Sequence, residues 1–199
     1  MSDHILFVER DQTALIDSGY AAHAGQTFAL VESALAGRPL ERLFNTHLHS
    51  DHCGGNAALQ ARYPDLLTEI PPGEAPYVAQ WEDAALSYIA TGEQCARSHF
   101  DGVLSPGTAC VLGDPAWDIH AAPGHDPHAV LVFEPVSRTL IFADALKRLR
   151  VAFTELAGEP SFADIGDTPD ELAGLAAQLL EELAASGGTT IDGDLIRNN

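Results

Sequence analysis

Short apolar runs alternate with polar turns at the start of the chain, and this pattern predicts a β-hairpin followed by a helix. Ile5–Val8 and Thr13–Asp17 have the composition of strands, and four polar residues separate them. Within Ala24–Ala36 the apolar residues recur at helical spacing, and a Gly-x-Pro sequence follows. Leu40–Asn45 is a short apolar run, which predicts a third strand.

The middle of the chain alternates between helical and strand patterns. Asn56–Tyr63 and Ala75–Ala90 are predicted helices, and the polar stretch Thr91–Pro106 is a predicted loop. Four strand-like segments follow, separated by turns that contain proline or glycine: Ala109–Leu112, Trp117–Ala121, Ala129–Phe133 and Thr139–Phe142.

The last part of the chain predicts one more helix and strand. Thr168-Pro169-Asp170-Glu171 has the form of a capping box, and leucines recur at helical spacing up to Gly187. Thr189–Ile191 would form a final strand. Strands followed by helix in each half predict an α/β (α+β) fold, in which two sheets pack together with helices outside. We expect one domain over residues 1–199.

Composition limits the class of protein and its partners. The chain of 199 residues is 46% hydrophobic and 20% charged, as in ordinary globular proteins. Its net charge of −19 would repel phosphate backbones, so we expect no nucleic-acid partner. No signal peptide pattern and no long apolar run is present, so we expect no membrane association. Three cysteines, an odd number, fit free thiols in a reducing cytoplasm.

One stretch, Thr46-His47-Leu48-His49-Ser50-Asp51-His52-Cys53-Gly54-Gly55, concentrates three histidines and a carboxylate. Neutral imidazole and carboxylate form a ligand set for transition metals. The stretch lies between a predicted strand and a predicted helix, where α/β folds place their chemistry. In an extended segment His47 and His49 point to one side, whereas Asp51 and His52 follow as the chain turns and can serve a second ion.

Two later strand ends offer further ligands. His125 follows the strand Trp117–Ala121 in a loop shaped by proline and glycine, and it can complete a set of three imidazoles with His47 and His49. Asp144 closes the apolar strand Thr139–Phe142. A carboxylate in that place is often only a helix cap, but beside a histidine cluster we favour a ligand that bridges two ions.

These motifs, in this order, resemble the metallo-β-lactamase superfamily. Leu15-Ile16-Asp17-Ser18-Gly19 is similar to the Asp-x-Gly signature on the second strand of that family. The resemblance implies an αββα sandwich with a two-zinc site between its sheets. Asp51-His52-Cys53-Gly54-Gly55-Asn56, Ala143-Asp144-Ala145-Leu146 and the Phe153–Pro160 segment look most like the glyoxalase II-like and quinoprotein-relay branch.

The resemblance also implies a role for each ligand. His47, His49 and His125 would bind the first ion, Asp51 and His52 the second, and Asp144 would bridge the two. The family usually adds a last His after the final strand, where this chain has Asp194. Either Asp194 substitutes for it, or the second site is weak, or the sequence is short at its carboxyl terminus.

By this resemblance the expected activity is hydrolysis of a small ester, thioester or related acyl substrate by zinc-bound hydroxide, with Asp51 orienting the hydroxide. One or two zinc ions are expected, and iron is possible. Two alternatives remain: a mononuclear-iron oxidoreductase like the persulfide dioxygenases, and an impaired metal-binding member that lacks the last histidine. The expected partner is a small-molecule substrate, and the sequence leaves the oligomeric state open.

Two neighbours of the cluster have alternative interpretations. Asp17 would hold a loop or a ligand imidazole, or would be a simple turn residue at a strand end. Cys53 could contact the second ion, but we favour a small buried residue.

Overall fold

The computed structural model describes residues 4–10, 12–123, 126–137 and 139–144 of the chain. The chain divides into two compact units, residues 1–143 and residues 144–199. All the described residues except Asp144 belong to the first unit. The single domain expected over residues 1–199 stays a prediction.

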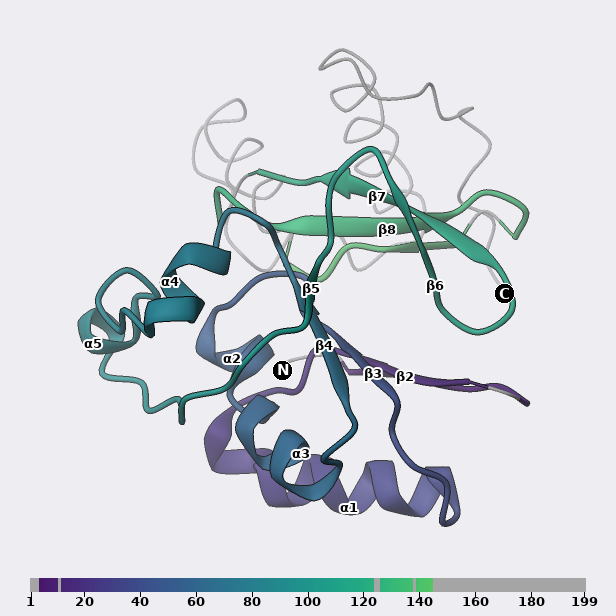
Figure 1. Cartoon of the computed structure of the whole chain (residues 1–199), viewed down its shortest axis with the longest axis horizontal. Coiled ribbons are helices and arrows are strands. Elements are labelled where there is room, and N and C mark those ends of the chain that lie inside the picture. The colour runs from purple at the N-terminus through teal and green to yellow at the C-terminus, as the bar shows by residue number, and fades with distance from the viewer. Residues whose placement is uncertain (1–3, 11, 124–125, 138, 145–199) are drawn as a thin grey trace, which may run out of the picture. The chain divides into compact units, whose positions relative to one another are not determined.

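The first sheet combines an antiparallel hairpin with parallel strands (Figure 1). Its strands, in spatial order, are β1 (Ile5–Val8), β2 (Thr13–Ile16), β3 (Arg42–Phe44), β4 (Leu67–Ile70) and β5 (Gly102–Val103). β1 pairs with β2 antiparallel, and the remaining neighbours are parallel. Parallel strands are normally covered on both faces, and this sheet follows that rule.

The second sheet is an antiparallel meander. It consists of β6 (Ala109–Val111), β7 (Ala116–Ala121), β8 (Val130–Glu134) and β9 (Thr139–Ile141), in that spatial order. These strands agree with the four predicted segments to within one residue at every end.

Side-chain alternation along β2 and β3 separates two layers of core. Ile16 and Phe44 belong to a cluster that also contains Trp117, Val130 and Val132 of the second sheet. Residues of opposite parity in β2 and β3 pack on the other face of the first sheet, against helices: Leu15, Val31, Leu35, Leu40, Leu43, Leu59, Tyr63 and Leu66. The period of two thus places the first sheet between the second sheet and a helical layer.

The helical layer on the outer face consists of α1 (Ala24–Leu35) and α3 (Asn56–Arg62), which lie below the first sheet in Figure 1. A short 3-10 helix, η1 (Ala21–His23), precedes α1, and the four-residue helix α2 (Ser50–Cys53) precedes α3. Two sheets with helices packed outside them confirm the predicted fold class. The predicted helix after Thr168 and the strand Thr189–Ile191 lie outside the described residues.

The predicted helix Ala75–Ala90 is wrong as a single element. The segment forms two short helices, α4 (Ala75–Gln80) and α5 (Tyr88–Thr91). Trp81 and Ser87 have φ values of +56° and +64°, which break the helix at both sides of the intervening turn. Neither residue is a glycine, so the break had no signal in the sequence.

The strands β4 and β5 were also missed, since residues 67–70 carry only a weak apolar pattern and β5 lies inside the predicted loop Thr91–Pro106. In the described part of the chain, no helix has both the length and the apolar character needed to cross a membrane.

Candidate metal centre

The histidine stretch follows β3 directly, at the carboxyl end of the parallel strands. The backbone N–H of Asp17 donates to the Phe44 carbonyl at 2.8 Å, and that of Asn45 donates to the Glu69 carbonyl at 3.0 Å. These bonds extend the β2–β3 and β3–β4 pairings by one residue. Asp17 and the histidine loop therefore lie at neighbouring strand ends, the place where open α/β sheets bind ligands.

The four side chains of the motif converge. The ring centroid of His47 lies 4.6 Å from that of His49 and 4.0 Å from that of His52. Ligand atoms of His47 and His49 lie within 4.8 Å of each other, as do those of Asp51 and His52. His47 and His52 are 1% and 3% exposed, whereas the side chains of His49 and Asp51 are 28% and 22% exposed. The cluster thus extends from the buried rings of His47 and His52 to the partly exposed side chains of His49 and Asp51.

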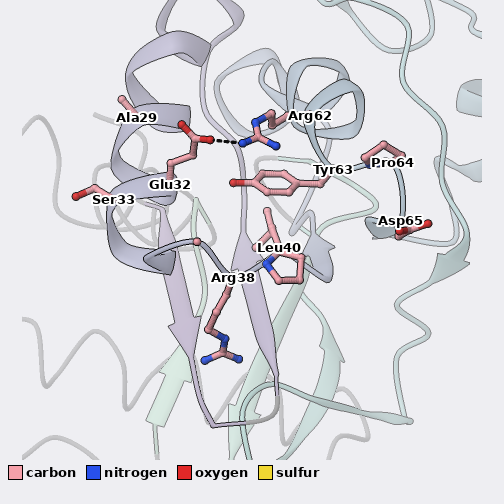
Figure 2. Close-up of a pocket in the computed structure, with 11 residues that line it drawn as sticks. Ala29, Glu32, Ser33, Arg38, Leu40, Arg62, Tyr63, Pro64 and Asp65 are labelled. Atoms are coloured by element: carbon pink, nitrogen blue, oxygen red, sulfur yellow. Dashed lines mark hydrogen bonds and ion pairs between the residues drawn. The ribbon is translucent and has the colours of Figure 1, made fainter.

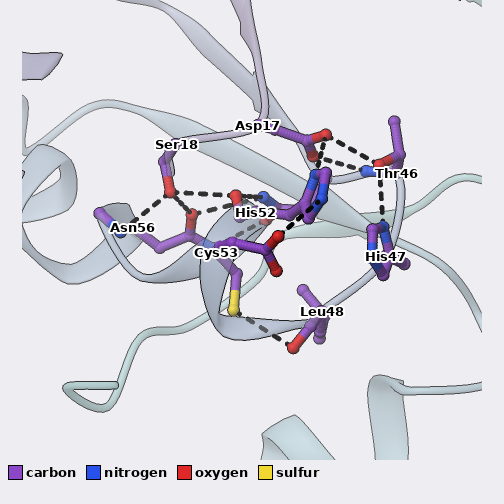
Figure 3. Close-up of polar contacts among 11 residues, drawn as sticks. Asp17, Ser18, Thr46, His47, Leu48, His52, Cys53 and Asn56 are labelled. Atoms are coloured by element: carbon purple, nitrogen blue, oxygen red, sulfur yellow. Dashed lines mark hydrogen bonds and ion pairs between the residues drawn. The ribbon is translucent and has the colours of Figure 1, made fainter. Parts of the chain in front are cut away.

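Asp17 anchors the loop and one imidazole (Figure 3). Its Oδ1 accepts the Thr46 backbone N–H at 2.9 Å, and its Oδ2 accepts the Thr46 hydroxyl at 2.8 Å. The same Oδ2 lies 2.8 Å from Nδ1 of His52. Asp17 is only 1% exposed, so these contacts are made away from water. Of the two interpretations of Asp17, the one in which it holds an imidazole is confirmed.

The hydrogen bonds around Asp17 also determine which ring nitrogens carry protons. Because a carboxylate only accepts, Nδ1 of His52 must be the donor. The Thr46 hydroxyl donates its hydrogen to Asp17. Its oxygen, which lies 3.2 Å from Nδ1 of His47, therefore accepts a hydrogen bond from that nitrogen. In the neutral tautomers this places the lone pair on Nε2 of both His47 and His52, the atom through which each would bind a metal ion.

Thr46 also joins the loop to the second sheet. Its carbonyl accepts the backbone N–H of Val130, the first residue of β8, at 2.8 Å. The residue before His47 is therefore bound on one side to the end of β2, through Asp17, and on the other side to β8.

A second polar network fixes the backbone of α2. The His52 carbonyl accepts the Ser18 backbone N–H at 2.6 Å and the Asn45 amide at 3.1 Å. The Ser18 hydroxyl donates to Asn56 Oδ1 at 2.6 Å, and the Asn56 amide donates to Asn45 Oδ1 at 2.7 Å. All these groups are buried, so the position of His52 is set by several hydrogen bonds at once.

The two glycines after the motif allow the helix to approach the strand end. A Cβ on Gly54 would lie closer than 3.0 Å to backbone atoms of Ala21, Ser50 and Gly19. A Cβ on Gly55 would lie 2.5 Å from the Ser18 carbonyl oxygen. Gly54 has an ordinary helical φ of −60°, so the lack of space, rather than the backbone conformation, requires glycine there.

Two buried acids near the histidine loop, Asp126 and Glu74, were missed in the sequence. Oδ2 of Asp126 lies 3.6 Å from Nε2 of His49, and Oδ1 accepts the His128 backbone N–H at 2.7 Å. Burial raises the pKa of Glu74 to about 8; the negative charge of Asp126 adds to the rise, and a hydrogen bond from the Leu48 backbone opposes it. In the sequence, the one sign of such a role is the position of Asp126 directly after the predicted ligand His125.

The structure does not test the roles of the remaining predicted ligands. His125 and Asp194 lie outside the described residues, so their roles stay predictions. Asp144 comes three residues after the end of β9 and is the first residue of the second unit, and its bridging role also stays a prediction. Cys53 is buried in an apolar cluster with Leu48 and Tyr88, in agreement with the interpretation of a small buried residue.

The residues of the loop fit a transition metal. Two buried imidazoles whose Nδ1 atoms are engaged, a third imidazole and a carboxylate form a nitrogen and oxygen donor set that suits zinc and also accommodates iron. Hydrogen bonding of the distal ring nitrogen is the usual support of a metal-ligating histidine. The loop is therefore a candidate metal-binding group.

A hollow elsewhere in the first unit has a different character (Figure 2). We call it the α1–α3 groove; it has a volume of about 750 Å³, and its lining consists of Ala29, Glu32, Ser33, Gly37, Arg38, Pro39, Leu40, Arg62, Tyr63, Pro64 and Asp65. Arg62 pairs with Glu32 at 2.5 Å, and Arg38 donates to the carbonyls of Glu9 and Gln12. Its two cations are thus already bound by the chain itself.

Comparison with known families gives a match over most of the chain. The family model described as the metallo-beta-lactamase superfamily matches residues 2–188. The match includes the histidine loop, Asp17 and both sheets.

Curated relatives are more distant. The hydroxyacylglutathione hydrolase of Thermosynechococcus vestitus is 26% identical over 117 residues, which cover 59% of this chain and 39% of the relative. The hydroxyacylglutathione hydrolase of a Synechocystis species is 26% identical over 131 residues, covering 57% and 48%. The chain thus spans less than half the length of the curated relatives it matches.

Solved structures share the fold. BJP-1, a subclass B3 metallo-beta-lactamase of Bradyrhizobium japonicum, is similar with a TM-score of 0.59 and 17% identity, covering 93% of this chain and 87% of that one. The native FEZ-1 metallo-beta-lactamase from Legionella gormanii has a TM-score of 0.60 and 15% identity, covering 97% and 80%. At these identities the likeness concerns the fold alone.

Proposed function

The chain belongs to the metallo-beta-lactamase superfamily, and from this premise we propose that it is a metal-dependent hydrolase of a small ester, thioester or related acyl compound. Two distant relatives named hydroxyacylglutathione hydrolase support hydrolysis as the reaction class. Because the chain spans less than half of each relative, their substrate is a starting point for assays rather than a conclusion.

The observation that carries the proposal is the set of hydrogen bonds made by Asp17. One buried carboxylate binds the Thr46 hydroxyl, which engages His47, and the same carboxylate binds His52 directly. In both His47 and His52 the proton is thereby held on Nδ1, so Nε2 carries the lone pair that would bind a metal ion. A purely structural histidine pair has no need of two matched tautomers, whereas a metal centre does.

Each of the two predicted ion sites includes one of the two histidines that Asp17 orients. His47 and His49 would serve the first ion, and Asp51 and His52 the second; Oδ2 of Asp51 lies 3.6 Å from Nε2 of His52. A bound zinc ion supplies Lewis acidity, which lowers the pKa of water to roughly 7 and polarises a carbonyl group. Asp51 is partly exposed, so its carboxylate can accept a hydrogen bond from a water molecule and orient that water towards an acyl carbon.

The test combines metal analysis with a substrate panel. The purified chain is loaded with zinc or iron, its metal content per chain is measured, and hydrolysis is followed on esters and thioesters, including acylated glutathione. The proposal expects hydrolysis that depends on zinc and is abolished by Asp51→Ala. Metal-dependent oxygen consumption with the iron-loaded chain would favour the oxidoreductase alternative, and no turnover by a fully loaded chain would favour the impaired member.

The variant Asp194→His tests whether a missing last histidine is the reason for an impaired second metal site. If Asp194 leaves the second site weak, the variant raises the metal content from one ion to two and increases turnover. Equal stoichiometry near two in both proteins would show that Asp194 is an adequate ligand or is not needed. Asp194→Ala serves as the matched control, since it removes the side chain without offering an imidazole.

A further inference from the structure

The backbone carbonyl of Leu48 lies between two predicted metal ligands, His47 and His49, in a part of the loop without helix or strand. Leu48 is only 3% exposed, so this carbonyl is shielded from water. No backbone N–H in the described part of the chain donates to it. A buried carbonyl without a backbone donor needs a donor from a side chain.

The main donor to the Leu48 carbonyl is the hydroxyl of Tyr88, a residue 40 positions further along the chain. The hydroxyl donates to the carbonyl oxygen at 3.0 Å, and both groups are buried. Sγ of Cys53 lies 3.4 Å from the same carbonyl oxygen (Figure 3) and 3.0 Å from the hydroxyl. Because a thiol is a weak donor, the Tyr88 hydroxyl makes the stronger bond to this peptide group.

Tyr88 is the first residue of α5, and its side chain is fixed by packing as well as by this bond. It belongs to the same apolar cluster as the Leu48 side chain, and its ring centroid lies 6.0 Å from that of Trp81. The preceding residue, Ser87, has a φ of +64°, which costs free energy in a residue other than glycine. Such a conformation persists only where surrounding contacts hold it, and here they include the packing and the hydrogen bond of Tyr88.

The peptide group between Leu48 and His49 influences where the His49 ring points. The hydrogen bonds of Asp17 and Thr46 orient the rings of His47 and His52. His49 follows Leu48 directly, so a rotation of the peptide plane that carries the Leu48 carbonyl also turns the Cα–Cβ bond of His49. The bond from Tyr88 opposes that rotation.

We propose that Tyr88 is a positioning residue of the metal centre: by holding the Leu48 carbonyl, its hydroxyl keeps the side chains of His47 and His49 directed to one side, towards a shared ion. The inference rests on the proposed function, from which the metal ion follows. Without the hydroxyl, the weak thiol donor of Cys53 is the remaining described partner of the carbonyl, so the peptide group can rotate. The ion is then bound more weakly and with altered geometry, although none of its ligands has been replaced.

The experiment compares the full chain with its Tyr88→Phe variant. Competition with a chromophoric chelator measures the affinity for zinc, and the visible absorption of the cobalt-loaded chain reports the geometry of the ligands. The variant is expected to bind zinc about 10-fold more weakly and to show a changed cobalt spectrum. A folded Tyr88→Phe chain with the wild-type affinity and spectrum would overturn the inference, even if its stability is reduced. A wild-type chain that binds neither metal would instead overturn the proposed function itself.

Tyr77→Phe is the matched control, because it removes the same atom from the same cluster. Tyr77 packs against the cluster from α4, and its hydroxyl makes no hydrogen bond with another described residue. This variant should keep the wild-type zinc affinity and cobalt spectrum.

Val78→Ala separates the hydroxyl from the packing around it. Val78 is buried in the cluster, so alanine there should lower the free energy of unfolding, while the Tyr88 hydroxyl stays in place and the cobalt spectrum should not change. A changed spectrum in folded Val78→Ala would show that the packing of the cluster, and not the hydroxyl, positions the loop, and it would overturn the inference. This comparison decides the question even if Tyr88→Phe fails to fold.

Discussion

The histidine loop and the α1–α3 groove lie at opposite ends of the same parallel strands. The groove is lined by residues that precede β3 and β4, whereas the loop follows the carboxyl end of β3. The groove has ample volume, but its two arginines are already bound by neighbouring residues of the chain. The loop instead gathers buried imidazoles whose proton positions are fixed by Asp17. Oriented polar groups at the carboxyl strand ends, more than the size of a hollow, distinguish the candidate site.

The largest expected effect comes from filling the space under the loop. Gly54→Ala forces a Cβ against backbone atoms of Gly19, Ala21 and Ser50 and should reduce the free energy of unfolding by about 3 kcal/mol. Gly25→Ala is the matched control: Gly25 lies in α1 with nothing near its Cβ position, so alanine there should stabilise the chain by up to about 1 kcal/mol. Denaturant unfolding of both variants measures the difference. Equal effects at the two positions would contradict the close packing of α2.

Asp17→Asn tests the anchor of the site. Asparagine tolerates the φ of +57° at this position, but its amide replaces one of the two accepting oxygens. Thr46 or His52 then loses its partner, and affinity for zinc should fall by about 10- to 100-fold. Competition with a chromophoric chelator measures the affinity. Glu32→Gln in the α1–α3 groove is the control and should leave it unchanged; wild-type affinity in Asp17→Asn would remove the basis of the proposed function.

Glu74 should make the stability of the metal-free chain depend on pH. Its pKa is raised from about 4.5 to about 8 in the folded state, so between these values the folded chain holds a proton that the unfolded chain releases. Stability from this group is complete below pH 4.5 and is lost as the pH rises towards 8, by up to about 1.4 kcal/mol for each pH unit. Glu74→Gln should flatten this part of the curve, as measured by urea unfolding at several pH values. A variant with the wild-type slope would show that another group is responsible.

The smallest effect is expected in the groove. The Arg62 and Glu32 side chains are 52% and 40% exposed, so their ion pair is screened by water. Glu32→Gln should change the free energy of unfolding by less than about 1 kcal/mol and leave hydrolysis unaffected. Thermal unfolding and the substrate panel measure both. A clear loss of hydrolysis would mean that the groove, and not only the loop, takes part in function.

The sequence predicts the loop well because its chemistry is local. His47, His49, Asp51 and His52 lie within six residues between a strand and a helix, and the structure brings them together as the spacing implies. The role of Asp17 was one of two open interpretations, since a turn residue and an anchor have the same sequence context.

The features that the sequence did not predict all depend on contacts between residues that are distant in the chain. The burial of Glu74 and Asp126 beside the loop depends on how α4 and the segment before β8 pack, and no short-range pattern encodes it. Likewise, β4 has few apolar residues of its own and forms because β3 offers it hydrogen bonds. Residues 145–199, with the predicted last helix and Asp194, lie outside the described part of the chain.

The double attachment of Thr46 has a consequence for the lifetime of the folded chain. Because this residue is bonded both to Asp17 at the end of β2 and to Val130 of β8, the two sheets cannot part without displacing the neighbouring His47. An ion that binds the folded loop but not the unfolded chain would therefore also stabilise this contact between the sheets, and it would slow unfolding as well as shift its equilibrium. Resistance to proteolysis should then follow metal supply, so that in a cell short of metal the chain is degraded sooner.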